Sequence, residues 1–211
     1  MSDRLWTYFW GRLPDHSFFH FAHFRKEGKE WGHISLNGEF LEGEFPLIIK
    51  IPHKKYKFET PLLSLELEAV TPSIQHEDSP THKHYSTPVL MGEGVDAWME
   101  IEYLTYSQKD WEWLALHLGD ISIMAYKREK DSFAKFILGN KVIESSFELT
   151  AHILYLTKLG MCFYLEPVYS EIIFHPKNGR PYSETPFNVI FRTKKIGYGM
   201  RERTYKEKEV V

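Results

Sequence analysis

Two glutamates, Glu100 and Glu102, are the residues of this sequence best placed for acid–base chemistry. They alternate with apolar residues, so an extended strand puts both carboxylates on one side, together with Asp96 and Trp98. A carboxylic acid in apolar surroundings can donate a proton, and an aromatic face can stabilise a nearby cation. We therefore predict Glu100 and Glu102 as the catalytic candidates. The alternative is a solvent-exposed face on which the carboxylates serve solubility.

A second group of aromatic residues follows at Trp111, Trp113 and His117, which share one face of a predicted strand, while leucines occupy the other. The leucine face suits packing between layers, which leaves the tryptophan face as a candidate pocket wall with His117 as its polar group. The alternative is a core filled by the tryptophans, because small barrels are usually filled by side chains. The residues that we expect to line a ligand site are Trp6, Tyr8, Trp98, Tyr103, Trp111, Trp113 and His117.

Eleven histidines raise the question of a metal site. His82 and His84 would lie on one side of an extended strand, and His76 is close in sequence. A polar loop collects such residues by composition, however, and nothing nearby supplies the outer hydrogen bonds of a metal site. We predict no metal and no cofactor, and leave this loop as an open question. Three more histidines fall on separate predicted strands and are expected in the core or at its rim: His20, His23 and His33.

Composition excludes several classes of protein. The net charge of −3, from 26 basic and 29 acidic residues, is unlike a nucleic-acid-binding surface. The single cysteine, Cys162, excludes an internal disulfide and a multi-cysteine metal site. No apolar run approaches the roughly 20 residues of a membrane helix, and the first residues do not resemble a signal peptide. We therefore expect a cytoplasmic protein without a transmembrane segment.

The elements that position these residues are predicted to be strands. Short runs of alternating apolar and polar residues are broken by glycine, proline or Asn37-Gly38, and 16% of the residues are aromatic. Residues 111–118 and 121–128 predict a hairpin around Gly119-Asp120. Residues 71–87 predict a long loop because they are rich in histidine, serine and threonine. We detect no internal repeat, and about a dozen short strands favour a barrel or sandwich.

Three segments also resemble, in the same order, motifs of the carotenoid 1,2-hydratase (hydroxyneurosporene synthase)-like family. Leu5–Asp15 is similar to the family's opening strand, and Gly94–Glu102 to its Gly-x-x-Trp-Met-Asp-x-Glu element, with Glu100 in place of the aspartate. Trp111–Leu118 resembles its Trp-Asp-Trp-Phe-x-Leu-x-Leu strand. The resemblance covers about residues 5–128, and the chain is shorter than members with two full barrels.

The resemblance implies an all-β fold of lipocalin-like antiparallel β-barrels: one domain at 1–130 and a second, smaller or partial one at 131–211. It also implies an aromatic-lined pocket for an isoprenoid- or polyketide-like molecule, which the protein would hydrate, isomerise or cyclise with Glu100 or Glu102 as the acid. Because folds host many functions, a non-catalytic carrier and a structural interaction module stay open. The expected partner is a hydrophobic small molecule and not a nucleic acid, and the question of a homodimer is left open.

Overall fold

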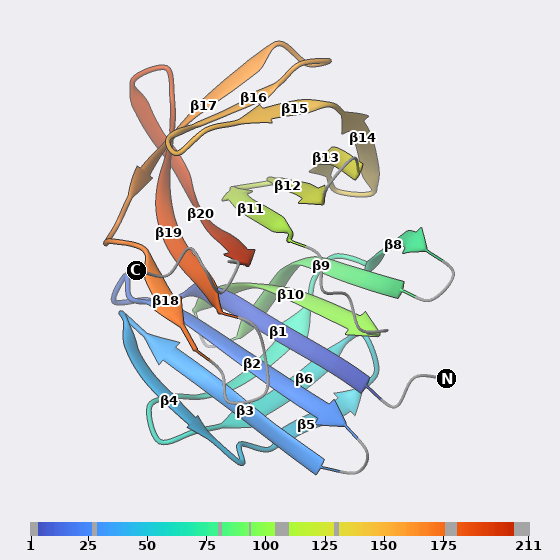
Figure 1. Ribbon diagram of the computed structural model, residues 1–211, viewed down its shortest axis with the longest axis vertical. Helices are drawn as coiled ribbons and strands as arrows, with labels where there is room; N and C mark the ends of the chain where they lie inside the picture. Colours follow the sequence, from blue (N-terminus) through green and yellow to red (C-terminus); the bar gives the residue numbers. More distant parts are fainter. Residues whose placement is uncertain are drawn as a thin grey trace. The chain divides into compact units, whose positions relative to one another are not determined.

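The computed structural model describes residues 4–26, 29–79, 82–92, 94–103, 110–128, 131–175 and 181–204. Throughout these ranges the regular elements are β-strands, so the predicted all-β class is confirmed (Figure 1). The chain divides into two compact units, Met1–Ser107 and Gln108–Val211, and each contains one antiparallel sheet. In the part of the chain that is described, no helix is long and apolar enough to cross a bilayer.

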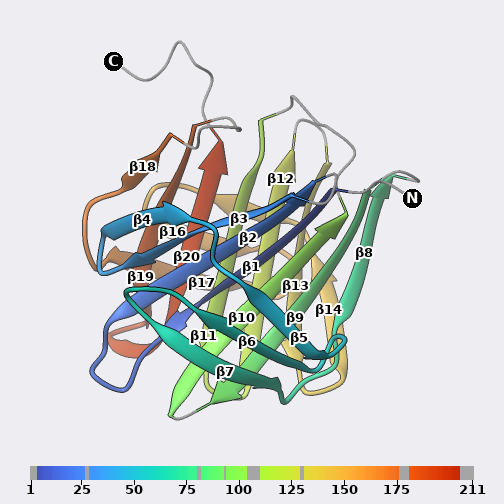
Figure 2. The same ribbon diagram turned by 90° about the horizontal axis from the view of Figure 1, so that it is seen from below.

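In the first unit, the first strand, β1, pairs with the last strand, β10, and this pairing joins two runs of neighbouring strands into one sheet. Its strands follow the order β4-β3-β2-β1-β10-β9-β7-β6-β5, and β8 pairs with β9 outside this path. Figure 2 shows β5, β6 and β7 running across β1, β2 and β3. The strands are β1 (Arg4–Arg12), β2 (Phe18–Lys26), β3 (Lys29–Leu36), β4 (Glu39–Gly43), β5 (Leu47–Ile51), β6 (Lys55–Glu59), β7 (Ser64–Ala69), β8 (Ile74–Ser79), β9 (His82–Gly92) and β10 (Val95–Tyr103).

The second unit repeats this connectivity strand for strand. Its order is β14-β13-β12-β11-β20-β19-β17-β16-β15, with β18 paired to β19 outside the path. The repeat lies in the topology, which explains why the sequence alone shows none. The strands are β11 (Glu112–Leu118), β12 (Ile121–Arg128), β13 (Asp131–Leu138), β14 (Lys141–Ser145), β15 (Phe147–Leu149), β16 (Ile153–Leu156), β17 (Met161–Pro167), β18 (Ile172–Phe174), β19 (Tyr182–Phe191) and β20 (Lys194–Thr204).

Two expectations about these elements need correction. The sequence placed the domain boundary at residue 130, but β11 and β12 pair with β20 and β13, so both strands belong to the second unit. The predicted long loop at residues 71–87 instead contains β8 and the first part of β9. These strands pair with each other, and the pairing satisfies their backbone hydrogen-bonding groups. Their low hydrophobicity is the reason that the sequence did not predict them as strands. The hairpin of β11 and β12 is confirmed, with Gly119 at a φ of 72°.

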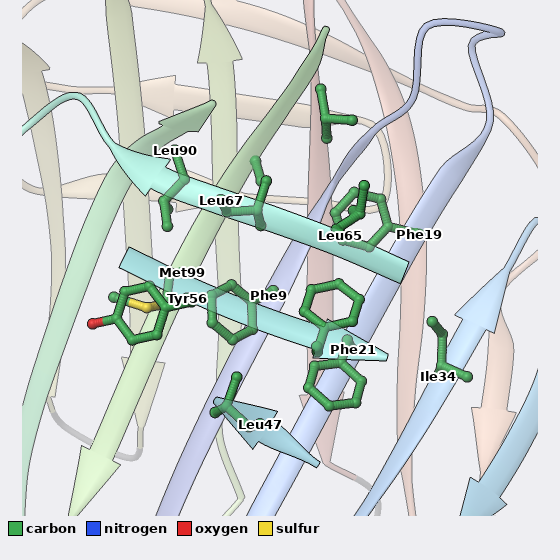
Figure 3. Packing of buried hydrophobic residues seen from close by; sticks show 13 residues of the cluster. Phe9, Phe19, Phe21, Ile34, Leu47, Tyr56, Leu65, Leu67, Leu90 and Met99 are labelled. Atoms are coloured by element: carbon green, nitrogen blue, oxygen red, sulfur yellow. The ribbon is translucent and has the colours of Figure 1, made fainter. Parts of the chain in front are cut away.

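The core of the first unit contains four phenylalanines, three of which alternate with other residues along β1 and β2. Phe21 stacks on Phe58 with ring centroids 4.3 Å apart, and Phe9 meets Tyr56 edge-on at 5.4 Å (Figure 3). These ring contacts join β1 and β2 to β6, which is not hydrogen-bonded to either of them. The buried cluster comprises Phe9, Phe19, Phe21, Ile34, Leu47, Tyr56, Phe58, Leu65, Leu67, Leu90, Val95, Ala97 and Met99.

The second unit has a separate and more aliphatic core. Leu114 and Leu116 of β11 are fully buried in it, which confirms that the leucine face of this strand packs between layers. Leucines of β16 and β17 face them from the other side of the unit. The buried cluster comprises Leu114, Leu116, Ile123, Ala125, Ala134, Leu154, Leu156, Phe163, Leu165, Phe187 and Val189.

Candidate functional site

Each sheet has two faces, and the face that carries the buried cluster of its unit is called the core face here. The opposite face of the first sheet is also aromatic and is called the aromatic face. On it Trp6 stacks on Phe24, with centroids 5.8 Å apart, and Trp10 on Trp98, with centroids 6.3 Å apart. Its members are Trp6, Tyr8, Trp10, His20, Phe24, Trp31, His33, Phe40 and Trp98.

The register of β1 and β10 brings several of the predicted site residues together. Glu102 is paired with Trp6, Glu100 with Tyr8, and Trp98 with Trp10. The acidic and aromatic positions therefore form two facing rows at the level of the backbone. The side chains of Glu100, Glu102 and Tyr103 lie outside the described part of the structure. Tyr103 is paired with Leu5, one position out of step with these rows.

The remaining predicted lining residues belong to the second unit. Trp113 and His117 alternate with the core leucines of β11, so both point away from the core of their own unit, and both are buried. The His117 ring packs against Tyr198, with centroids 5.3 Å apart. Trp111 precedes β11, and its backbone N–H donates a 3.0 Å hydrogen bond to the Thr204 hydroxyl. The structure thus divides the predicted lining residues between the two units.

The loop histidines also have defined backbone positions. His76 on β8 is paired with His84 on β9, and His82 with Ser79. The register therefore brings the backbone of His76 next to that of His84, a pairing that the sequence interpretation did not predict. Their side chains lie outside the described residues, so metal binding at this place stays an open question.

A polar layer interrupts the core face of the first unit. Thr7 and His23 are direct cross-strand partners on β1 and β2, and their exposed fractions are 0% and 2%. Among the residues that the structure describes, the Thr7 hydroxyl has no hydrogen-bond partner. Leaving a buried hydroxyl without a partner costs about 1–3 kcal/mol, so this atom is an expensive feature of the fold.

Small residues continue this layer across the sheet. His23 is paired with Gly32, and Gly32 with Gly43, so two neighbouring positions on the core face have no side chain. The Phe45 ring covers Gly43, since a Cβ atom there would lie 2.9 Å from it. The layer therefore consists of two hydrogen-bonding side chains beside two glycines, directly above the ring of Phe21.

An ion pair lies at the rim beside this layer. The Arg25 Nε–H donates a 2.6 Å hydrogen bond to Glu30 Oε1, and Glu30 Oε2 lies 3.5 Å from His23 Nε2. Burial lowers the pKa of His23, an effect that the Glu30 carboxylate partly opposes. The imidazole is therefore neutral near pH 7, and offers one nitrogen as a donor and the other as an acceptor. The pairing of Thr7 with His23 therefore sets a hydroxyl group and a neutral imidazole on neighbouring strands in apolar surroundings.

The second unit differs, because the polar groups on its core face already have partners. Arg201 donates from Nε to Glu112 Oε1 at 2.6 Å, and from Nη1 to the Thr150 carbonyl at 3.2 Å. Arg203 forms two 2.8 Å hydrogen bonds with the Glu171 carboxylate. Ion pairs that satisfy their own hydrogen bonds leave little for a ligand. The first unit is therefore the better candidate for ligand binding.

The sequence interpretation did not single out Thr7 and His23. In the sequence Thr7 stands between Trp6 and Tyr8, and alternation puts its side chain on the face opposite to theirs. His23 was expected in the core or at its rim. The available signal was their polar character on strands that are otherwise apolar on both faces. Recognising the layer requires the register of β1, β2 and β3, which pairs these two residues with each other and with Gly32.

Two antiparallel sheets, each curled around its own apolar core, give the chain a lipocalin-like fold. The chain is similar to the crystal structure of a protein described as an AttH from Nitrosomonas europaea, with a TM-score of 0.72, 14% sequence identity and coverage of 96% of this chain and 92% of that one. At this identity the likeness shows the fold alone.

A second solved structure, of a DUF3598 family protein of unknown function from Nostoc punctiforme, is 10% identical over 96% of this chain and 95% of that one. Its TM-score of 0.19 adds nothing to the assignment of the fold. No model of a known protein family matches the sequence, and no curated protein matches it either.

Proposed function

We propose that the first unit binds a largely apolar small molecule, isoprenoid- or polyketide-like, that carries one hydroxyl or carbonyl oxygen. The ligand oxygen meets Thr7 and His23, and its hydrocarbon part lies against the phenylalanines next to them. The lipocalin-like fold supports this proposal, because such barrels suit ligands of this size and polarity.

The observation that carries the proposal is the buried Thr7 hydroxyl, for which the described part of the chain offers no hydrogen-bond partner. Valine has nearly the same shape as threonine and fits a strand equally well, so packing alone gives no reason for the hydroxyl. A ligand oxygen would satisfy it and would turn a cost into binding energy. A hydrocarbon that lacks the oxygen would leave the Thr7 hydroxyl unsatisfied, and the site would discriminate against it.

The test compares two isoprenoids that differ in one group: farnesol, an alcohol, and farnesene, its hydrocarbon counterpart. We expect the wild-type protein to bind farnesol about tenfold more tightly, which corresponds to one hydrogen bond of about 1.4 kcal/mol. Displacement of an apolar fluorescent dye measures both affinities. Thr7→Val should reduce the preference to near unity and leave farnesene binding unchanged.

Thr157→Val is the matched control, because Thr157 lies in the second unit and already donates a hydrogen bond to the Ser146 carbonyl. It should keep the wild-type preference for farnesol. Equal affinities of the wild-type protein for both isoprenoids would contradict the role of Thr7. Absence of saturable binding by the dye and by both isoprenoids would contradict the proposal as a whole.

Catalysis is the second candidate function, and one observation favours it. The register pairs Glu100 with Tyr8 and Glu102 with Trp6, so two acidic positions adjoin the aromatic face. This is the arrangement that a hydratase or cyclase of the carotenoid 1,2-hydratase-like family would use to protonate an alkene and stabilise the cation. The predicted roles of Trp98 and Tyr103 belong to this proposal, while those of Trp111, Trp113 and His117 stay a separate prediction for the second unit.

Mass spectrometry separates catalysis from binding. The protein is incubated with an isoprenoid, and the mass of the released molecule is measured. A carrier returns the molecule unchanged, whereas a hydratase adds the mass of one water. Cyclisation and isomerisation keep the mass but change the chromatographic retention. If turnover is found, Glu100→Gln and Glu102→Gln should each be tested, and full activity in both would contradict the assignment of the acid.

A further inference from the structure

Two histidines on the aromatic face lie against each other. His20 on β2 and His33 on β3 have ring centroids 5.1 Å apart and planes inclined at 82°. Their ring nitrogens lie within 4.8 Å of each other. Both side chains are buried, with an exposed fraction of 1% each. The two residues occupy neighbouring strands and diagonal positions, since His20 is paired with Ser35 and His33 with Ala22.

Aromatic rings surround this pair and hold it in place. Tyr8 stacks on His20 at a centroid distance of 5.8 Å, while Phe24 and Phe40 flank His33 at 5.6 and 5.4 Å. Burial lowers the pKa of His20 to about 3 and also lowers that of His33, with a further contribution from His20. The neutral imidazole is the form of histidine that binds metal ions.

We propose that His20 and His33 are two ligands of a first-row transition-metal ion, with Zn²⁺ as the representative. Imidazole nitrogen is a preferred ligand of Zn²⁺, Cu²⁺ and Ni²⁺. At zinc–nitrogen distances of about 2.0–2.1 Å, two tetrahedral ligand atoms lie about 3.3 Å apart. The ring nitrogens lie within 4.8 Å of each other, so metal binding requires them to approach by at most about 1.5 Å. The proposal is independent of the ligand assigned to Thr7 and His23, which lie on the opposite face of the sheet.

Cobalt serves as a spectroscopic probe for the same site. The full-length protein is stripped with a chelator and titrated with Co²⁺, and the visible absorption bands of the bound ion are recorded. We expect saturation at one ion per chain. His20→Gln and His33→Gln should each weaken binding about 100-fold or more, because loss even of an outer partner of a metal ligand costs 10–100-fold.

His152→Gln is the matched control, since His152 is an exposed histidine of the second unit. It should keep the wild-type affinity and stoichiometry. Unchanged Co²⁺ binding in both His20→Gln and His33→Gln would overturn the proposal. Equal loss in all three variants would also overturn it, because it would point to scattered surface histidines.

His33→Cys keeps the test decisive if a glutamine variant does not fold. A cysteine at this position remains a metal ligand, and a sulfur–cobalt bond adds an intense near-ultraviolet charge-transfer band. We expect this band in His33→Cys and not in the wild-type protein. The only cysteine of the wild-type sequence, Cys162, is exposed and belongs to the second unit. A folded His33→Cys protein that binds Co²⁺ without the band would exclude position 33 as a ligand.

Discussion

Replacement of Thr7 by valine should make the protein more stable. The hydroxyl is fully buried and forms no hydrogen bond with any described residue, and its desolvation costs about 1–3 kcal/mol. Valine removes this cost and puts a methyl group against Phe9 and Phe21, the neighbours of Thr7 and His23 on the core face. We therefore expect Thr7→Val to raise the free energy of unfolding of the first unit by about 1–3 kcal/mol.

Thermal unfolding provides the assay. For a unit of this size, 1 kcal/mol shifts the midpoint by about 4 °C, so we expect a rise of about 4–12 °C. Thr87→Val is the matched control, because Thr87 is just as buried but its hydroxyl lies 2.7 Å from the Ser73 hydroxyl. This substitution should lower the free energy of unfolding by about 1–2 kcal/mol, since it leaves Ser73 without its partner.

Comparison of Thr7→Val with Thr87→Val shows whether the Thr7 hydroxyl lacks a hydrogen-bond partner in solution. If Thr7→Val is no more stable than the wild-type protein while Thr87→Val is destabilised, then the Thr7 hydroxyl has a partner in solution. A hydroxyl that is already hydrogen-bonded would not need a ligand oxygen at this position. If Thr7→Val gains stability and also loses its preference for farnesol, the hydroxyl has been kept at the expense of stability for the sake of binding.

Three further predictions follow from packing and charge. Phe21→Ala removes a fully buried ring stacked on Phe58 and should lower the free energy of unfolding by about 3–5 kcal/mol, measured by urea denaturation; a loss below 1 kcal/mol would contradict the described core. Lys50 and Lys55 lower the pKa of Glu66 to about 2, so this carboxylate stabilises the fold above its ordinary pKa of 4.5, and the effect is lost as the pH falls towards 2. Glu66→Gln should therefore flatten acid unfolding between these values, an effect that high salt reduces; an unchanged acid limb would contradict the ion pair. Gly92→Ala should unfold or strongly destabilise the first unit, as followed by circular dichroism, because its Cβ would lie 2.0 Å from the Glu66 carbonyl oxygen; a variant of wild-type stability would contradict this close approach.

Local patterns were sufficient to predict many of the strands. Alternation along β1 and β2, the Asn37-Gly38 turn and the hairpin around Gly119 each depend on a few adjacent residues. The β8–β9 pair was mistaken for a loop because its residues are polar, although pairing alone can hold such strands. The domain boundary was misplaced because it depends on the partner of β11, which is β20 at the far end of the unit.

The candidate site depends on which face of a strand is the core, and here the residues give no local signal. Strand β1 carries Trp6, Tyr8 and Trp10 on one face and Phe9 on the other, so both faces look buried. Only the rings that cross from β6, Tyr56 and Phe58, identify the core face. The sequence interpretation consequently selected tryptophans, while the pairs Thr7–His23 and His20–His33 required the register of three strands.

The shared topology of the two sheets has a consequence for synthesis of the protein. All described partners of β1 to β10 lie within the first unit, so its hydrogen-bond ladder is complete as soon as β10 leaves the ribosome. Closure waits for β10 to reach β1, a contact of high sequence separation that slows folding. The same delay recurs when β20 reaches β11. Two slow closures in succession, each confined to about a hundred residues, keep the unpaired edges of the nascent chain apart in time and limit mispairing between the units.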